Sequence, residues 1–208
     1  MPSTLVHVAV AGLVGCALLA EEFSPRAIGV VLLAAVVPDL DTFAGFLLPG
    51  AHRSLLHSLL FPALLAAVLL WDTRIAASSW LRARWGESAP RVAWVAVAGL
   101  LAGGIAPDLF TNGVNTFYPL HDAFYSVNGE LLLSDQRGVV QTFVELQSAQ
   151  PPQTTQTIHY STGVDPSPGQ EAENVERIFP VAASGTQLLL ILLGTGSVLA
   201  RLWTDRRE

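Results

Sequence analysis

Two aspartates and two histidines stand between residues 38 and 60, in sequence otherwise apolar enough to lie in a lipid bilayer. They are Asp39, Asp41, His52 and His57. A carboxylate or imidazole at membrane depth is costly unless it pairs with a charge, binds an ion or lines a wet cavity. Both groups are ligands for divalent cations, and Arg53 is the one basic residue near enough in sequence to neutralise the acids. The stretch predicts a metal site, with pairing to Arg53 as the alternative.

The composition indicates a membrane protein and narrows the kind of metal site. Of the 208 residues, 51% are hydrophobic and only 13% are charged. The single cysteine, Cys16, excludes a thiolate-rich zinc site, so His, carboxylate and water would have to hold the metal. The net charge is −6, which argues against a basic face. Nucleic acid is therefore not among the expected partners.

Five apolar segments predict an all-α integral membrane protein of the plasma or inner membrane with about five transmembrane helices. These segments are residues 5–20, 26–48, 54–71, 92–110 and 179–203. We expect residues 1–110 to form a four-helix membrane core with the metal site, and residues 179–208 to hold the last helix and a basic tail. Residues 13–16, Leu-Val-Gly-Cys, also fit a lipoprotein cleavage pattern, although the small residues around Cys16 favour close helix packing instead.

Residues 111–178 form an acidic, aqueous insertion between the fourth and fifth apolar segments. Eight acidic residues and two arginines lie between residues 111 and 177, among many Thr, Gln, Ser, Asn and Pro residues. Segments 130–133 and 139–146 flank a polar turn and predict a β-hairpin. Residues 150–170 have the composition of a flexible loop.

The two aspartates fall where the second apolar segment is interrupted by Pro38. In a regular helix Asp39 and Asp41 would point to nearly opposite sides, roughly 200° apart. Both can reach one ion only if the backbone is irregular, and Pro38 supplies a reason for that irregularity. His52 and His57 are five residues apart, which places His52 on the preceding turn and His57 on a third helix that Ser54 could cap.

Charge bias in the connections predicts the orientation of the chain. The loop at residues 72–91 and the C-terminal tail carry most of the arginines, so both are expected in the cytoplasm. Helix lengths then bring a set of polar residues to one depth toward the outer face. This set is His7, Asp39, Asp41, His52, His57 and Asp108.

These motifs, in this order, resemble the YdjM-type membrane proteins that are described as metal-dependent hydrolases. The match covers about residues 1–120 and consists of His7, the sequence Pro-Asp-Leu-Asp at 38–41, the sequence His-Arg-Ser-Leu-Leu-His-Ser at 52–58, and Asp108. The resemblance implies a divalent cation, zinc in preference to manganese or magnesium, and hydrolysis of a phosphoester in a small or lipid-like substrate at the membrane. The family usually has a histidine four residues before the late aspartate, where this chain has Gly104.

The residues themselves supply a mechanism consistent with that resemblance. The candidate metal ligands are His7, Asp39, Asp41, His57 and Asp108, with His121 as a substitute for the missing family histidine. The candidate catalytic residues are Asp41 as proton acceptor, and Arg53 or His52 as the group that holds negative substrate oxygens. The alternative is a non-catalytic membrane protein whose buried His and Asp residues tie helices together or bind an ion without turnover.

Overall fold

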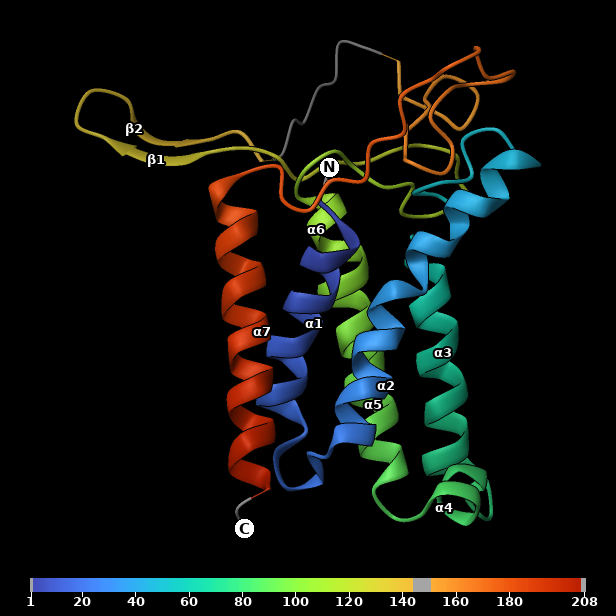
Figure 1. The fold of residues 1–208 in the computed structure, drawn as a ribbon, viewed down its shortest axis with the longest axis vertical. Coiled ribbons are helices and arrows are strands. Elements are labelled where there is room, and N and C mark those ends of the chain that lie inside the picture. Colours follow the sequence, from blue (N-terminus) through green and yellow to red (C-terminus); the bar gives the residue numbers. More distant parts are fainter. Residues whose placement is uncertain (1, 144–150, 207–208) are drawn as a thin grey trace.

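The computed structural model describes residues 2–143 and 151–206. Helices stand side by side, and long loops gather at one end of the bundle together with the N-terminus (Figure 1). The C-terminus and the connection that contains α4 (Trp80–Trp85) lie at the opposite end. This grouping is the one that the charge bias predicts: the N-terminus and the polar insertion share one side, and the arginine-bearing connection and tail share the other.

Three helical stretches among the described residues are long and apolar enough to cross a membrane. They are Pro25–Phe46, Ala89–Leu109 and Gly185–Asp205. The first consists of α2 (Pro25–Val36) and a 3-10 turn, η2 (Pro38–Phe46). The second consists of α5 (Ala89–Gly99), a π-helical turn, η4 (Leu100–Ile105), and α6 (Ala106–Leu109). The third is α7 (Gly185–Asp205).

The other two apolar helices are shorter, so the predicted count of five spans is not confirmed. Helix α1 (Thr4–Leu18) has 15 residues. Helix α3 (Leu60–Leu70) has 11 residues and continues into a π-helical turn, η3 (Trp71–Ile75). What is confirmed is the break in the second segment, because the α-helix ends at Val36 and the backbone changes to 3-10 geometry at Pro38.

The third helix begins six residues later than the sequence predicts. The Ser54 hydroxyl donates to the backbone oxygens of Gly50 and Ala51, at 2.6 and 2.8 Å, and does not cap a helix. The Leu59 amide donates to the Thr116 carbonyl at 2.9 Å. Because backbone groups here form hydrogen bonds outside a helix, residues 51–59 form an irregular turn. The expectation that His57 lies on a helix is therefore wrong.

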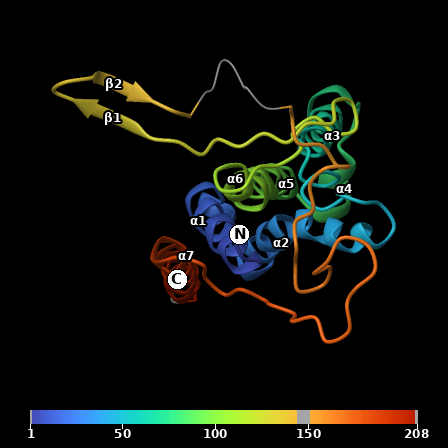
Figure 2. The same ribbon diagram turned by 90° about the horizontal axis from the view of Figure 1, so that it is seen from above.

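Helices α1, α2 and α5 form the centre of the bundle, and small residues let them approach closely. Ala11, Ala27, Ala35 and Ala96 lie in this core. Helix α7 packs against α1 at one edge of the bundle (Figure 2). A side chain at Gly103 has no room, because a Cβ atom there would lie 2.8 Å from both the Ala11 Cβ and the His7 carbonyl oxygen. The η4 turn thus contacts the α1 backbone directly.

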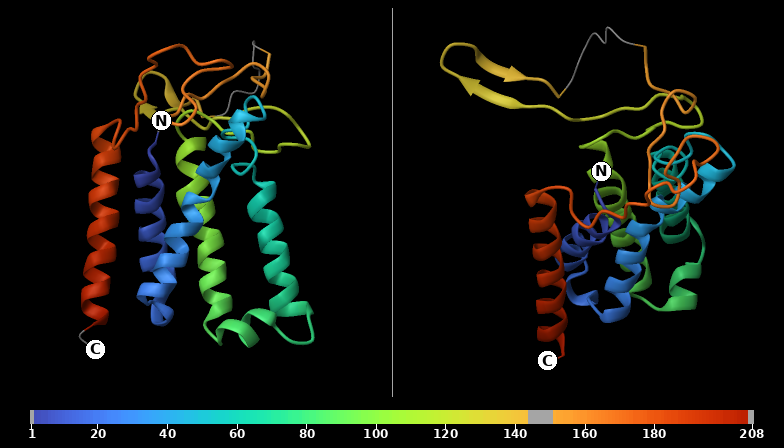
Figure 3. Two further views of the ribbon diagram at one scale, coloured as in Figure 1. Left: turned by 45° about the vertical axis from the view of Figure 1, so that its right-hand side comes forward. Right: turned by 45° about the horizontal axis from the view of Figure 1, so that its top comes forward.

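Strands β1 (Leu131–Ser134) and β2 (Gly138–Gln141) pair antiparallel and form the predicted hairpin. The predicted end of its second strand, at residue 146, lies outside the described residues. The hairpin projects sideways from the loop end of the bundle (Figures 1 and 3). It therefore does not contribute to the bundle core.

The remaining loops are tied together through Asp122. Its carboxylate accepts hydrogen bonds from the Thr155 amide and hydroxyl, at 3.0 and 2.7 Å, and from the Asn115 amide at 2.7 Å. Burial alone would raise the Asp122 pKa, but these hydrogen bonds outweigh it and hold the pKa below its ordinary value. The stabilisation that these hydrogen bonds give is therefore fully present above the ordinary pKa of an aspartate. It is lost as the pH falls through the lowered pKa of Asp122.

The close approach at Gly103 gives a first prediction. We expect Gly103→Ala to lower the free energy of unfolding by about 1–3 kcal/mol, because the added methyl group must displace the α1 backbone. The matched control is Gly29→Ala in α2, where a Cβ atom meets nothing within 4 Å. That control is expected to unfold at the same temperature or higher, since alanine is the better helix former. Thermal unfolding in detergent compares the two. Equal melting temperatures would contradict the account of this contact.

Candidate metal centre

The ring of His57 lies between two carboxylate groups at the loop end of the bundle. Its Nδ1 hydrogen-bonds to Asp41 Oδ2 at 2.9 Å. Its Nε2, on the other side of the ring, lies 3.0 Å from Asp108 Oδ2 and 3.8 Å from Asp39 Oδ1. The side chain is fully buried. Asp39 and Asp41 therefore face opposite edges of one imidazole, which is how the change of helix geometry at Pro38 brings both to the same neighbourhood.

His7 approaches the same two carboxylates from α1. Its Nε2 lies 3.5 Å from Asp108 Oδ2 and 3.8 Å from Asp39 Oδ1. Its Nδ1 is 2.7 Å from the carbonyl oxygen of Gly103, so Nδ1 carries the hydrogen and the Nε2 lone pair faces the acids. The ligand atoms of His7, Asp39 and Asp108 all lie within 4.8 Å of one another, and His57 Nε2 faces the same two carboxylates. We call His7, Asp39, His57 and Asp108 the four-residue cluster.

The four-residue cluster has the donor set and spacing that fit a divalent cation. Ligand atoms around a tetrahedral zinc ion lie roughly 3.3 Å apart, given metal bonds of about 2.0–2.1 Å. The four nitrogen-to-oxygen distances here run from 3.0 to 3.8 Å. His57 Nε2 is buried without a hydrogen-bond partner among the described residues, although the Asp108 oxygen is close. At 3.0 Å from Asp108 Oδ2, that nitrogen is placed either to donate to this oxygen or to bind a cation beside it.

The charge of the buried site also fits a divalent cation. Asp39, Asp41 and Asp108 bring three negative charges, and among the described residues Arg53 is the only arginine in contact with them. With neutral histidines the site carries a charge of −2. Uncompensated charge of this size among apolar helices is strongly unfavourable. One divalent cation would neutralise the site.

Asp41, His52 and His57 form a second group of potential ligands that shares His57 with the cluster. Its facing atoms are already paired with one another: His52 Nδ1 lies 2.8 Å from Asp41 Oδ1, and His57 Nδ1 lies 2.9 Å from Asp41 Oδ2. A carboxylate that accepts the outer N–H of a metal-binding histidine fixes its tautomer and orientation. The geometry therefore suits Asp41 to orient the two histidines, and the predicted direct metal bond to Asp41 would require these hydrogen bonds to break.

Arg53 lies behind Asp108 and is almost completely buried. Its Nη2 donates to Asp108 Oδ1, while Nε and Nη1 have no hydrogen-bond partner among the described residues. The guanidinium lies 4.5 Å from the ring centroid of Tyr160, which covers it from the polar insertion. Burial raises the pKa of the Tyr160 phenol, and the nearby Arg53 charge partly opposes this. The Arg53 backbone has φ +65°, a conformation that non-glycine residues rarely adopt.

His121, the predicted substitute ligand, belongs to neither group of potential ligands among the described residues. It is exposed, and its ring centroid lies 6.2 Å from that of Tyr125. The missing family histidine has a structural explanation at Gly104. A Cβ atom there would lie 2.9 Å from the Ala35 carbonyl oxygen and 3.0 Å from Pro38 Cγ. In this chain close packing of η4 on α2 occupies the space that a histidine would need.

Three supporting groups escaped the sequence reasoning. The Thr4 hydroxyl donates to Asp39 Oδ2 at 2.5 Å, and its position one helical turn before His7 could have indicated this. The Gly103 carbonyl leaves no trace in side-chain patterns. Tyr160 is far from Arg53 in sequence, and no spacing rule connects the two residues.

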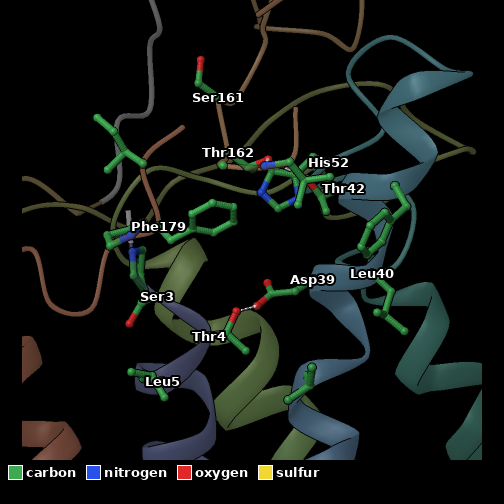
Figure 4. A pocket seen from close by; sticks show the side chains of 17 residues that line it. Ser3, Thr4, Leu5, Asp39, Leu40, Thr42, His52, Ser161, Thr162 and Phe179 are labelled. Atoms are coloured by element: carbon green, nitrogen blue, oxygen red, sulfur yellow. Dashed lines mark hydrogen bonds between the residues drawn. The ribbon is translucent and has the colours of Figure 1, made fainter. Parts of the chain in front are cut away.

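Access to the cluster is from the side of Asp39. Its side chain is 21% exposed, whereas those of the other three members are at most 2% exposed. Asp39 and His52 line a cavity of about 440 Å³ between the loop-side ends of α1 and α2 and the loops above them. Figure 4 shows Asp39 bonded to Thr4, with His52 and Thr162 above it. A molecule in this cavity would meet Asp39 first.

Comparison with known proteins gives one match. A family model described as YdjM inner membrane protein matches residues 1–164, which reaches beyond the first 120 residues and takes in Tyr160 and Thr162. No curated protein and no solved structure matches the chain.

The zinc content and zinc affinity of variants distinguish residues that bind the metal from residues that only orient its ligands. We expect purified protein to hold zinc, and His7→Ala or Asp39→Asn to lose it, because each removes one of the converging atoms. Asp41→Asn is expected to weaken affinity by roughly 10–100-fold without abolishing binding, as loss of a supporting hydrogen bond does.

The control is His121→Ala, which makes the same change as His7→Ala outside the cluster. It should bind zinc as the wild type does. Elemental analysis gives the content, and competition with a chromogenic chelator gives the affinity. Zinc retained by His7→Ala, or lost from His121→Ala, would overturn the assignment of ligands.

Proposed function

The chain belongs to the YdjM inner membrane protein family, and we propose that this member is a membrane-bound metal-dependent hydrolase of phosphoester bonds. The observation that carries the proposal is the convergence of His7 Nε2, His57 Nε2 and two carboxylate oxygens, with the opposite nitrogen of each ring already hydrogen-bonded. A tie between helices would need donors facing acceptors, whereas His7, with its hydrogen on Nδ1, turns the lone pair of Nε2 toward carboxylate oxygens at 3.5 and 3.8 Å.

Zinc is the proposed ion, because two imidazole nitrogens and two carboxylate oxygens suit it better than magnesium, which prefers octahedral oxygen ligands. His7, Asp39, His57 and Asp108 would hold it. When bound, a divalent cation supplies Lewis-acid chemistry, in that it makes water a stronger acid and polarises a phosphoryl oxygen. Asp39, the one accessible member, would lie nearest the substrate.

Asp41 and His52 form the proposed proton-handling pair. Asp41 Oδ1 is hydrogen-bonded to His52 Nδ1 at 2.8 Å, so His52 has Nε2 left to exchange a proton. His52 lines the cavity and can therefore exchange that proton with a molecule bound there. Asp41 would then stabilise the imidazolium, as well as orient His57.

Arg53 is proposed to balance negative charge on the substrate. It donates to Asp108, and two of its nitrogens have no hydrogen-bond partner among the described residues. Burial and the Tyr160 ring hold the guanidinium in place, so it is preorganised. Arg53 is 1% exposed and does not line the cavity, so it would offset substrate charge through Asp108 and without direct contact. Its planar arrangement of donors suits that carboxylate better than the ammonium of lysine does.

The predicted orientation would open this site toward the outer face of the membrane. The arginine excess in residues 72–91 and in the tail supports a cytoplasmic position for that end. We expect a cysteine introduced at Gly138, in the hairpin turn, to react with an impermeant maleimide in intact cells when Cys16 is replaced by serine. A cysteine at Ser88, at the opposite end of the bundle, is the control that should react only after lysis. The reverse pattern would place the site on the cytoplasmic side.

The experiment that tests the function is hydrolysis of bis-para-nitrophenyl phosphate by detergent-purified protein loaded with zinc. We expect activity that Asp39→Asn abolishes and that Arg53→Lys lowers roughly 100-fold in kcat/KM. The matched control is Arg82→Lys, the same change at an exposed arginine at the other end of the bundle, which should retain full activity.

Stoichiometric zinc without turnover of this or other phosphoesters would favour a non-catalytic ion-binding protein. Absence of zinc from the folded wild type, even after resupply, would favour histidines that only tie the helices together. Either result would reject the hydrolase proposal.

A further inference from the structure

The cavity beside the cluster is polar on one side and apolar on the other. Its polar wall contains Asp39, His52, Thr42 and Thr162. Its apolar wall is made by α1, by the end of α2 and η2, and by the chain just before α7, with the residues Leu5, Val36, Leu40, Phe43, Ile178 and Phe179. A cavity built in this way suits a molecule with a charged head and an apolar chain.

The apolar wall reaches the outer surface of the helices. Leu5, Leu40 and Phe43 line the cavity, yet they are 48%, 49% and 55% exposed. These residues lie near the loop end of α1 and in η2, so their exposed faces are at the level where the apolar helices meet the loops (Figure 1). An apolar chain could therefore enter from the surrounding lipid without crossing water.

The polar wall is closed from above by loop residues held in place. The Thr42 and Thr162 hydroxyls are hydrogen-bonded at 2.9 Å, and Ser3 donates to the Val181 carbonyl at 2.6 Å. The first bond fixes the loop near Asp39, where Figure 4 shows Thr42 and Thr162, and the second fixes the chain before α7 to the start of α1. The loop residues around Thr162 limit the size of the head group that fits between Asp39 and His52. The apolar wall places no comparable limit on the length of the hydrocarbon chain.

We propose that the cavity binds an amphiphilic phosphoester, with the phosphate beside His52 and next to the cation that Asp39 would help to hold, and with the hydrocarbon chain along Leu5, Val36 and Phe43. This inference rests on the proposed function and specifies its substrate class. Hydrolysis would add water across one P–O bond, so that one product keeps the phosphate and the other leaves as an alcohol. The cavity would bind lipid-borne phosphoesters in preference to soluble ones, because only the lipid-borne ones contact both the polar and the apolar wall.

The test measures binding and does not depend on turnover. Zinc-loaded protein in lipid nanodiscs is titrated with butyl-, octyl- and dodecylphosphonate, which are not hydrolysed. Empty nanodiscs measure how much ligand partitions into the lipid, so that each affinity refers to the ligand that is free in water. We expect affinity to rise roughly three- to fourfold for each methylene that enters the cavity. Val36→Trp, which fills the cavity from α2, should abolish this dependence on chain length. The matched control is Leu33→Trp, because Leu33 is 70% exposed on the same helix and does not line the cavity.

A second variant guards against misfolding of Val36→Trp. Phe43→Ala removes an exposed part of the apolar wall and should weaken dodecylphosphonate at least fivefold while leaving butylphosphonate unchanged. Equal affinity for all chain lengths in the wild type, or a chain-length dependence unchanged in both cavity variants, would overturn the inference. Hydrolysis of the soluble phosphodiester would then still stand as a separate result. Chain-length-dependent binding without any hydrolysis would instead overturn only the catalytic proposal.

Discussion

The rest of this structure depends on a group of three carboxylates that is packed among apolar helices and paired with one arginine. Asp41 and Asp108 are buried, and Asp39 is partly so. Burial of charge is tolerated only with compensation, and several neighbouring polar groups face these acids. The rings of His7, His52 and His57 all face them, and Arg53 adopts a rarely used backbone conformation to reach Asp108.

That arrangement requires helices that approach closely and end at the right height. Gly103 lets η4 touch α1, and its carbonyl fixes the ring of His7. Gly104 lets the same turn touch α2 at Ala35 and η2 at Pro38. The histidine that the family resemblance leads one to expect at this position has no room here. The chain therefore has a cluster of two histidines and two aspartates, with close backbone packing in place of a third imidazole.

The polar insertion contributes to the site although its composition is that of a loop. Tyr160 covers Arg53, and Thr162 bonds to Thr42 beside the cavity. Asp122 holds Thr155, a few residues earlier on the same segment. A loop held at several points can exclude water from buried acids and still leave one opening, on the side of Asp39, where the apolar walls begin.

The sequence alone determined which residues could matter, because ionisable side chains in apolar segments are unusual enough to stand out. His7, Asp39, Asp41, His57 and Asp108 are recognisable in this way, and Pro38 correctly predicts where the second helix changes its geometry. The β-hairpin follows from local pattern and turn chemistry.

Only the tertiary structure decided how those residues divide the work. Asp39 faces the convergent atoms and Asp41 faces the opposite edge of His57, a distinction that spacing along the chain does not contain. The irregular turn at residues 51–59 depends on hydrogen bonds to Thr116, and the cover over Arg53 depends on Tyr160. Such contacts join residues far apart in sequence. Local periodicity reports only which face of an element is apolar, so it cannot indicate which distant element packs against it.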